Sequence, residues 1–98
     1  RFINRILSPY EISQFKKKNS PSYLARRFAG KEAFSKAIGT GIGKPLRFND
    51  ITIFNNDLGK PEIRIEDMTK IHILKKYQNI HISLSDDYPM AIAFVLIS

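Results

Sequence analysis

The spacing of apolar residues changes from a helical period in the first half of the chain to strand alternation in the second half. Apolar residues at positions 2, 3, 6 and 7 have the spacing of a short helix. A second helix is predicted from Ser8, because Ser8 can cap it, Pro9 suits its first position and Glu11 completes a capping box. The polar run at 16–21 predicts the end of this helix and a turn, and its three lysines are interpreted as a solvated surface run.

A long central helix is predicted from Ser20 to about Ile38, where Gly39 ends it. Projected at roughly 100° per residue, this helix has two distinct sides. The expected core side carries Leu24, Phe28, Phe34 and Ile38. The neighbouring side carries small residues and two charges, namely Ala25, Ala29, Glu32, Ala33 and Lys36. Such a shallow stripe leaves room for another molecule to lie close against the helix.

The rest of the chain alternates as strands do, with turn residues between the apolar runs. The predicted elements are a strand over Phe48 to Phe54, a turn at 55–61, a strand over Glu62 to Ile65, a helix over Met68 to Tyr77, and two strands over Ile80 to Ser85 and Met90 to Ile97. The pattern therefore predicts a single α+β domain over residues 1–98, in which antiparallel hairpins pack with the long central helix.

Charge is distributed unevenly over the 98 residues, whose net charge is +7. Residues 1–47 hold eleven Lys and Arg against two acids, a balance of +9, and residues 48–98 hold five against seven, a balance of −2. The first half is therefore expected to meet an anionic partner, which can be a nucleic acid, a phosphorylated ligand or an acidic protein.

Cysteine usage and hydropathy restrict the setting of the protein. The sequence contains no cysteine, so disulfides and thiolate metal sites are excluded, which fits a reducing compartment. The longest apolar run, Met90 to Ile97, is far too short to cross a bilayer, and no signal peptide is expected behind the first residues. We expect a cytoplasmic protein without a membrane partner.

Glu32 and Lys36 carry the candidate chemistry of the central helix. At a spacing of four residues they can form a surface ion pair worth about 0.3–0.5 kcal/mol. Alternatively, Glu32 can bind a hard cation such as Mg²⁺, which prefers oxygen ligands and often keeps phosphate oxygens among them. The glycines at 39, 41 and 43 follow the helix, which is the wrong order for a P-loop, so they predict either a helix cap with a flexible turn or a close approach of backbone to a ligand.

Four segments together resemble the holo-acyl-carrier-protein synthases, the short trimeric class of 4′-phosphopantetheinyl transferases. They are "RFINRILSPYE" at 1–11, "RFAGKEAFSKAIGTGIG" at 27–43, "FNNDLGKPEIRI" at 54–65 and "IHISLSDD" at 80–87. They follow family order and cover most of the chain.

The resemblance implies transfer of phosphopantetheine from coenzyme A to a serine of apo-acyl carrier protein, in fatty acid biosynthesis and with Mg²⁺ as cofactor. It implies that Glu32 is a metal ligand and that Lys36 is the active-site lysine. Contacts to coenzyme A are expected at Arg27, Lys31, Gly39, Gly41, Gly43, His81 and Ser83. Contacts to the acidic carrier protein are expected at Arg1 and Arg5, and the assembly is expected to be a homotrimer with active sites between subunits.

The chain departs from the family pattern in two places. The family's N-terminal strand, which supplies a second metal ligand, has no match, and because the sequence begins without methionine we expect that strand ahead of Arg1. Asp86 stands where the strand motif usually has histidine, which weakens an expected contact to the 3′-phosphate of coenzyme A. His81 can alternatively be a packed strand histidine.

Two other functions fit parts of the sequence. A small nucleic-acid-binding module would use the basic first half for phosphates and the aromatic side chains for stacking. The aromatic residues fall mainly at core positions such as Phe28 and Phe34, which speaks against it. A catalytically inactive relative that still binds carrier protein is the third hypothesis.

Overall fold

The computed structural model describes residues 2–39, 46–66, 79–87 and 90–98 of the chain. Its elements in chain order are α1 (Phe2–Ile6), α2 (Pro9–Lys18), α3 (Pro21–Ile38), the 3-10 helix η1 (Phe48–Asp50), β1 (Ile51–Asn55), β2 (Pro61–Ile65), β3 (Ile80–Asp87) and β4 (Met90–Ile97). The predicted α+β class with antiparallel hairpins is confirmed. The predicted helix over 68–77 lies outside the described residues.

The helix boundaries follow the capping residues in the sequence. Ser8 accepts a hydrogen bond from the Glu11 amide and the Glu11 side chain accepts one from the Ser8 amide, so the predicted capping box is present. Ser20 caps α3 with Pro21 in its first turn, and Gly39 ends α3 with a φ of 80°, a left-handed conformation that favours glycine. The first three helices therefore begin and end close to where local signals place them.

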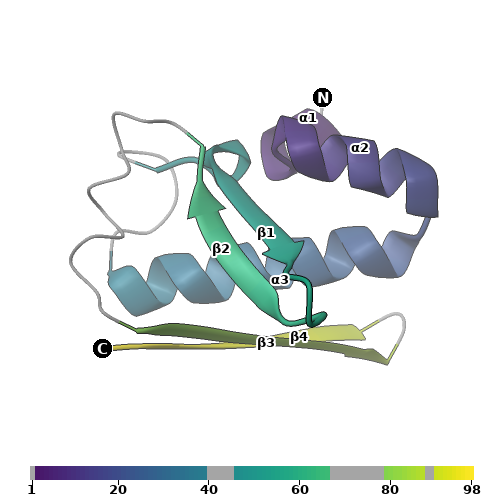
Figure 1. Cartoon of the computed structure of the whole chain (residues 1–98). Helices are drawn as coiled ribbons and strands as arrows, with labels where there is room; N and C mark the ends of the chain where they lie inside the picture. The colour runs from purple at the N-terminus through teal and green to yellow at the C-terminus, as the bar shows by residue number, and fades with distance from the viewer. Residues whose placement is uncertain (1, 40–45, 67–78, 88–89) are drawn as a thin grey trace.

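Two separate antiparallel hairpins pack against α3 (Figure 1). In the first, β1 pairs with β2 so that Ile53 lies opposite Ile63. In the second, β3 pairs with β4 over eight residue pairs, from Ile80 opposite Ile97 to Asp87 opposite Met90. In Figure 1, the β1–β2 hairpin crosses α3 obliquely and the β3–β4 hairpin runs along the length of α3, so α3 is the element that both hairpins share.

Residues 48–50 differ from the prediction. The predicted strand from Phe48 begins only at Ile51, because Phe48–Asp50 forms a turn of 3-10 helix in which the Asp50 carboxylate accepts from the Arg47 amide. A short polar side chain that bonds to nearby backbone favours a turn over a strand ladder.

The core consists of two clusters on different parts of α3. One cluster contains Phe34 with Leu46, Ile51, Ile53, Ile65 and Ile82, and the other contains Ile6, Leu7 and Tyr23. The predicted core side of α3 divides between them, because Phe34 and Ile38 join the first cluster while Leu24 and Phe28 pack against the second. The helix therefore connects the hairpins to the α1–α2 layer.

Gly30 lies where α3 comes closest to both hairpins. A Cβ atom at this position would lie 2.7 Å from Cδ1 of Ile53, 3.1 Å from a methyl of Leu84 and 3.3 Å from Cδ1 of Ile82. This close packing identifies the side of α3 that faces β1 and β3, and it fixes by helical geometry which residues face away from them.

Candidate functional site

Glu32 and Lys36 lie on the side of α3 that is turned away from the hairpins. Both side chains are exposed. They follow Gly30 by two and six residues, which at roughly 100° per residue places them about 200° and 240° around the helix from the packed side. Ala29 and Ala33 lie beside them on the same side of the helix by spacing, so the neighbouring side chains are small.

The Glu32 carboxylate is not used in folding. Within the described ranges, neither Lys36 nor any other residue lies within ion-pair distance of it, whereas Glu11 and Glu66 both have cationic partners. The simple surface ion pair is therefore not formed. The same ranges hold no group of three or more His, Asp and Glu side chains that could hold a metal by themselves. A single exposed carboxylate still fits Mg²⁺, which is often held by one or two carboxylates together with substrate phosphates and water.

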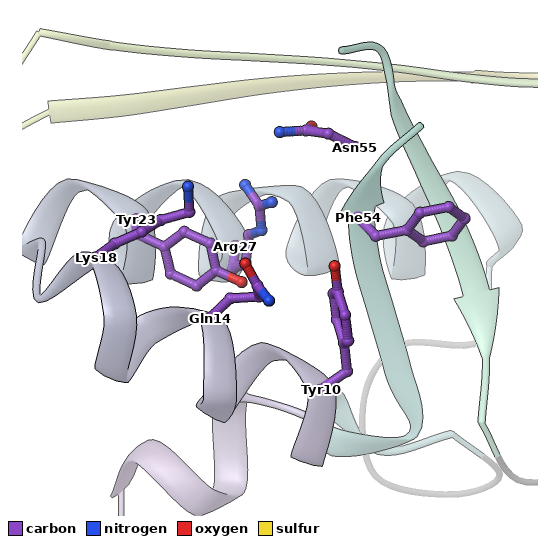
Figure 2. A pocket seen from close by; sticks show the side chains of 7 residues that line it. All are labelled: Tyr10, Gln14, Lys18, Tyr23, Arg27, Phe54 and Asn55. Carbon is purple, nitrogen blue, oxygen red and sulfur yellow. The ribbon is translucent and has the colours of Figure 1, made fainter. Parts of the chain in front are cut away.

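A polar cavity of about 180 Å³ lies at the other end of α3, next to α2 and β1 (Figure 2). Its lining consists of Tyr10, Gln14, Lys18, Tyr23, Arg27, Phe54 and Asn55. Figure 2 shows the polar ends of Gln14 and Tyr10 between α2 and β1, and the Arg27 guanidinium pointing toward the side of Asn55. Two of the lining residues are cationic and none is acidic, so the cavity favours an anion. Its volume corresponds to about six water molecules, which is room for a phosphate group.

Two polar atoms of this cavity are buried without a hydrogen-bond partner among the described residues, namely the Tyr23 hydroxyl and Nε of Arg27. Tyr23 is 1% exposed and Arg27 4% exposed, and the Arg27 guanidinium lies 4.3 Å from the centre of the Tyr23 ring. Burial raises the pKa of the Tyr23 hydroxyl, which keeps it a neutral donor, although the charge of Arg27 acts in the opposite direction. Unpaired buried donors are costly, so these two side chains are held in place at the expense of stability.

Lys31, which the sequence analysis places among the coenzyme A contacts, lies inside the fold with its ammonium bonded to groups of the same chain. Its side chain is fully buried, and Nζ donates to the Ile6 carbonyl at 2.6 Å, to Oε1 of Glu11 at 2.5 Å and to the Phe48 carbonyl at 2.9 Å. An ammonium has three donors, so none remains for a ligand. Burial lowers the pKa of Lys31, and the Glu11 carboxylate opposes this shift.

The remaining predicted site residues are dispersed in a single chain. His81 and Ser83 are exposed on β3, on the face opposite to Ile82 and Leu84, which pack toward α3. They therefore lie on the far side of the β3–β4 sheet from Glu32 and Lys36. Gly39 is exposed at the end of α3, and Arg5 is exposed in the last turn of α1. Arg1, Gly41 and Gly43 lie outside the described residues.

The sequence interpretation missed most of the cavity. Lys18 was assigned to a solvated lysine run, and Tyr10, Gln14 and Tyr23 received no functional role. These side chains come from α2 and α3 and are joined by Phe54 and Asn55 of β1. The sequence signal that the lining residues share is the excess of basic and aromatic residues in the first half. That excess does not specify which of these side chains lie together in the fold.

Comparison with known proteins assigns a class to this arrangement. Residues 1–93 match the model of the 4′-phosphopantetheinyl transferase superfamily, and the chain belongs to this family. A holo-[acyl-carrier-protein] synthase of Orientia tsutsugamushi strain Ikeda is 50% identical over 105 residues, covering 100% of this chain and 79% of the relative.

Solved structures agree with this class. The fold is similar to Helicobacter pylori holo-[acyl-carrier-protein] synthase in complex with coenzyme A, with a TM-score of 0.80 and 40% identity over 99% of this chain and 81% of that one. It is also similar to the Neisseria meningitidis holo-[acyl-carrier-protein] synthase, with a TM-score of 0.87 and 39% identity over 99% and 79% of the two chains. Among the described helices, none is long and apolar enough to cross a membrane.

Proposed function

We propose that this protein transfers the 4′-phosphopantetheine group from coenzyme A to a serine of apo-acyl carrier protein, and so supplies holo-acyl carrier protein for fatty acid biosynthesis in the cytoplasm. The observation that carries this proposal is the exposed pair on α3, in which Glu32 lacks a folding partner and Lys36 follows one turn later. Membership of the transferase superfamily and the similarity to holo-[acyl-carrier-protein] synthases support it.

Glu32 would hold Mg²⁺ beside the diphosphate of coenzyme A. When bound, Mg²⁺ supplies positive charge next to the phosphate oxygens on which negative charge develops as the bond breaks. Lys36 lies on the same side of α3, where its ammonium can neutralise diphosphate oxygens and donate a proton to the departing phosphate. Glu32 would therefore bind the metal and orient the diphosphate, and Lys36 would neutralise diphosphate oxygens and assist proton transfer around the departing phosphate.

Arg27 and Lys18 would bind a second phosphate of the same substrate. Arg27 precedes Glu32 by five residues, a rise of about 7.5 Å along the helix axis and a rotation of about 140° around it, so the cavity and the Glu32 side of α3 would bind different phosphates. The 3′-phosphate is the phosphate of coenzyme A that is remote from the diphosphate. The cationic lining, with Lys18 and Arg27 and without an acidic residue, supports its placement in the cavity.

Arg5 would help to receive the carrier protein. It is exposed at the end of α1, in the half of the chain whose charge balance is +9. A basic surface accelerates association with an acidic partner, and this acceleration falls as salt rises.

The central experiment incubates the protein with coenzyme A, Mg²⁺ and apo-acyl carrier protein, and measures the mass of the carrier. We expect a gain of one phosphopantetheine group. Glu32→Gln keeps the shape of the side chain but removes the charge that a hard cation requires, so it should lower the rate by at least about 10²-fold, as loss of 2.7 kcal/mol of transition-state stabilisation does. Glu62→Gln is the matched control, because Glu62 is an exposed glutamate on β2 whose replacement should leave the rate unchanged. No mass gain with the native chain would overturn the proposal.

The active form would be a homotrimer in which neighbouring copies cover the outer face of the β3–β4 sheet. On β4, Met90, Ile92, Phe94 and Leu96 are 55–65% exposed and follow one another at alternate positions. Across the register they lie beside Ser85, Ser83 and His81. An exposed apolar row of this length is typical of an interface between chains. A neighbouring copy at this face also supports the proposed roles of His81 and Ser83, because in one chain they lie on the far side of the sheet from Glu32.

Light scattering on the eluting protein tests the assembly. We expect three times the 11.3 kDa chain mass for the native protein and a lower mass for Phe94→Ser, which places a hydroxyl in the apolar row. Leu58→Ser is the matched control, since Leu58 is 92% exposed at the tip of the β1–β2 turn, away from this row. A native protein that elutes as a single chain would contradict the trimer and leave the transfer reaction to be judged on the mass measurement.

A further inference from the structure

One buried charge pair joins five elements of the fold. The Lys31 ammonium on α3 bonds the last carbonyl of α1 at Ile6 and the first carbonyl of η1 at Phe48. It also bonds Oε1 of Glu11 on α2, which accepts from the Ser8 amide as well. The other oxygen, Oε2, accepts from the Ile53 amide of β1 at 2.7 Å. Both charged side chains are fully buried.

These bonds restrain the rotation of α3 about its axis. On the hairpin side, Gly30 meets methyl groups of Ile53, Leu84 and Ile82, and such contacts are not directional. On the α1–α2 side, the Lys31 ammonium makes three directional hydrogen bonds, to α1, α2 and η1, which limit how far its end of the side chain can move. Because Glu32 is the next residue, any rotation of α3 that breaks the Lys31 bonds also turns the Glu32 carboxylate.

We propose that the Glu11–Lys31 pair is a positioning device that directs the Glu32 carboxylate, and through it the metal that Glu32 holds. This inference rests on the proposed function of Glu32. Lys31 and Glu11 are positioning residues, because neither touches the ligand and both are sealed inside the chain.

The charges alone do not explain the pair. Removing two charges from water is costly, and replacing a buried ion pair by apolar residues of similar size is often neutral or stabilising. Apolar residues would not reproduce the hydrogen bonds to the Ile6 and Phe48 carbonyls and the Ile53 amide, which both satisfy these backbone groups and hold α3 in one direction.

The test uses the double variant Glu11→Leu with Lys31→Met, which removes both charges at nearly constant volume. Circular dichroism and urea unfolding establish that it is folded. Mn²⁺ is the metal probe, and its free concentration is measured by electron paramagnetic resonance in the presence of coenzyme A. We expect the dissociation constant of Mn²⁺ to rise about 10–100-fold, the range found when groups that orient a metal ligand are replaced. The turnover number should fall, while KM for coenzyme A stays within a factor of about two.

Ile65→Val is the matched control for stability, because Ile65 is a buried apolar residue of the Phe34 cluster and carries no charge or side-chain hydrogen bond. It should lower the unfolding midpoint without changing Mn²⁺ binding, since a smaller folded fraction does not alter the affinity of the folded molecules. Should the double variant not fold, Glu11→Gln provides the same test. Its amide keeps the size and an acceptor but removes the charge, so Mn²⁺ binding should weaken in the same direction by a smaller factor.

The outcomes separate this inference from the proposed function. A native protein that binds no Mn²⁺ with coenzyme A, or transfers nothing, refutes the role of Glu32 itself. A native protein that does both, with a folded variant that binds Mn²⁺ equally well and keeps its turnover number, overturns the positioning role and leaves Glu11–Lys31 as a structural pair.

Discussion

The two lysines of α3 differ in whether the fold uses their charge. Lys31 is fully buried and its three donors are bonded, whereas Lys36 is exposed and lies one turn after Glu32, a glutamate without an ion-pair partner among the described residues. The residues are of the same type and five positions apart. The difference teaches that charge density in the sequence does not identify a site, and that the presence or absence of internal partners does.

The same comparison extends to the glutamates. Glu11 accepts from Ser8, Lys31 and Ile53 inside the molecule. Glu32 accepts nothing from a side chain in the described part of the chain. A carboxylate whose oxygens are fully used stabilises the fold, and one that is left open is available for a cation.

The largest expected effect is on stability and concerns the buried Glu11–Lys31 pair. Glu11→Leu alone leaves the Lys31 ammonium buried without its counter-charge, and such a change costs about 3–5 kcal/mol of unfolding free energy. Urea unfolding followed by circular dichroism measures it. The double variant with Lys31→Met should recover much of the lost unfolding free energy. Equal instability of the single and double variants would contradict the claim that Glu11 compensates the buried charge of Lys31.

The next largest effect is on the turnover number and concerns the exposed Lys36. Lys36→Ala should lower the turnover number by about 10²-fold, or 2.7 kcal/mol at the transition state, with the melting temperature nearly unchanged because the side chain is exposed. As an ordinary surface charge it would matter by less than about 1 kcal/mol. Lys17→Ala, an exposed lysine of α2, is the control. If Lys36→Ala turns over at the native rate with saturating coenzyme A, its catalytic role is wrong.

The smallest effect concerns Arg27 of the cavity. Arg27 is intermediate between Lys31 and Lys36, because it is buried but its Nε has no hydrogen-bond partner among the described residues. Arg27→Gln should raise KM for coenzyme A about tenfold, equivalent to 1.4 kcal/mol. The same variant should lose any preference for coenzyme A over its 3′-dephospho form, and Lys16→Gln on the surface of α2 should keep that preference. A preference that survives in Arg27→Gln would place the 3′-phosphate elsewhere.

The sequence by itself determined the local structure and the class of protein. Caps at Ser8, Ser20 and Gly39, and the alternation in the hairpin strands, depend on interactions within a few residues, and the structure agrees with them apart from the turn at Phe48–Asp50. The motif on α3 identified the transferase family, which the family match confirms. The exposed positions of Glu32 and Lys36 follow from helical spacing alone.

Only the tertiary structure decided which charged side chains are buried and which side chains from distant segments are in contact. Lys31 bonds partners 20 residues behind it and 17 ahead of it, and Glu11 reaches a backbone amide 42 residues away. The cavity likewise combines α2 and α3 with β1. No local pattern encodes such contacts, because whether a lysine is buried depends on the acceptors that distant segments bring to it. The burial of Lys31 could not be predicted for this physical reason, and the roles predicted for Lys31 and its neighbour Glu32 remain open to experiment.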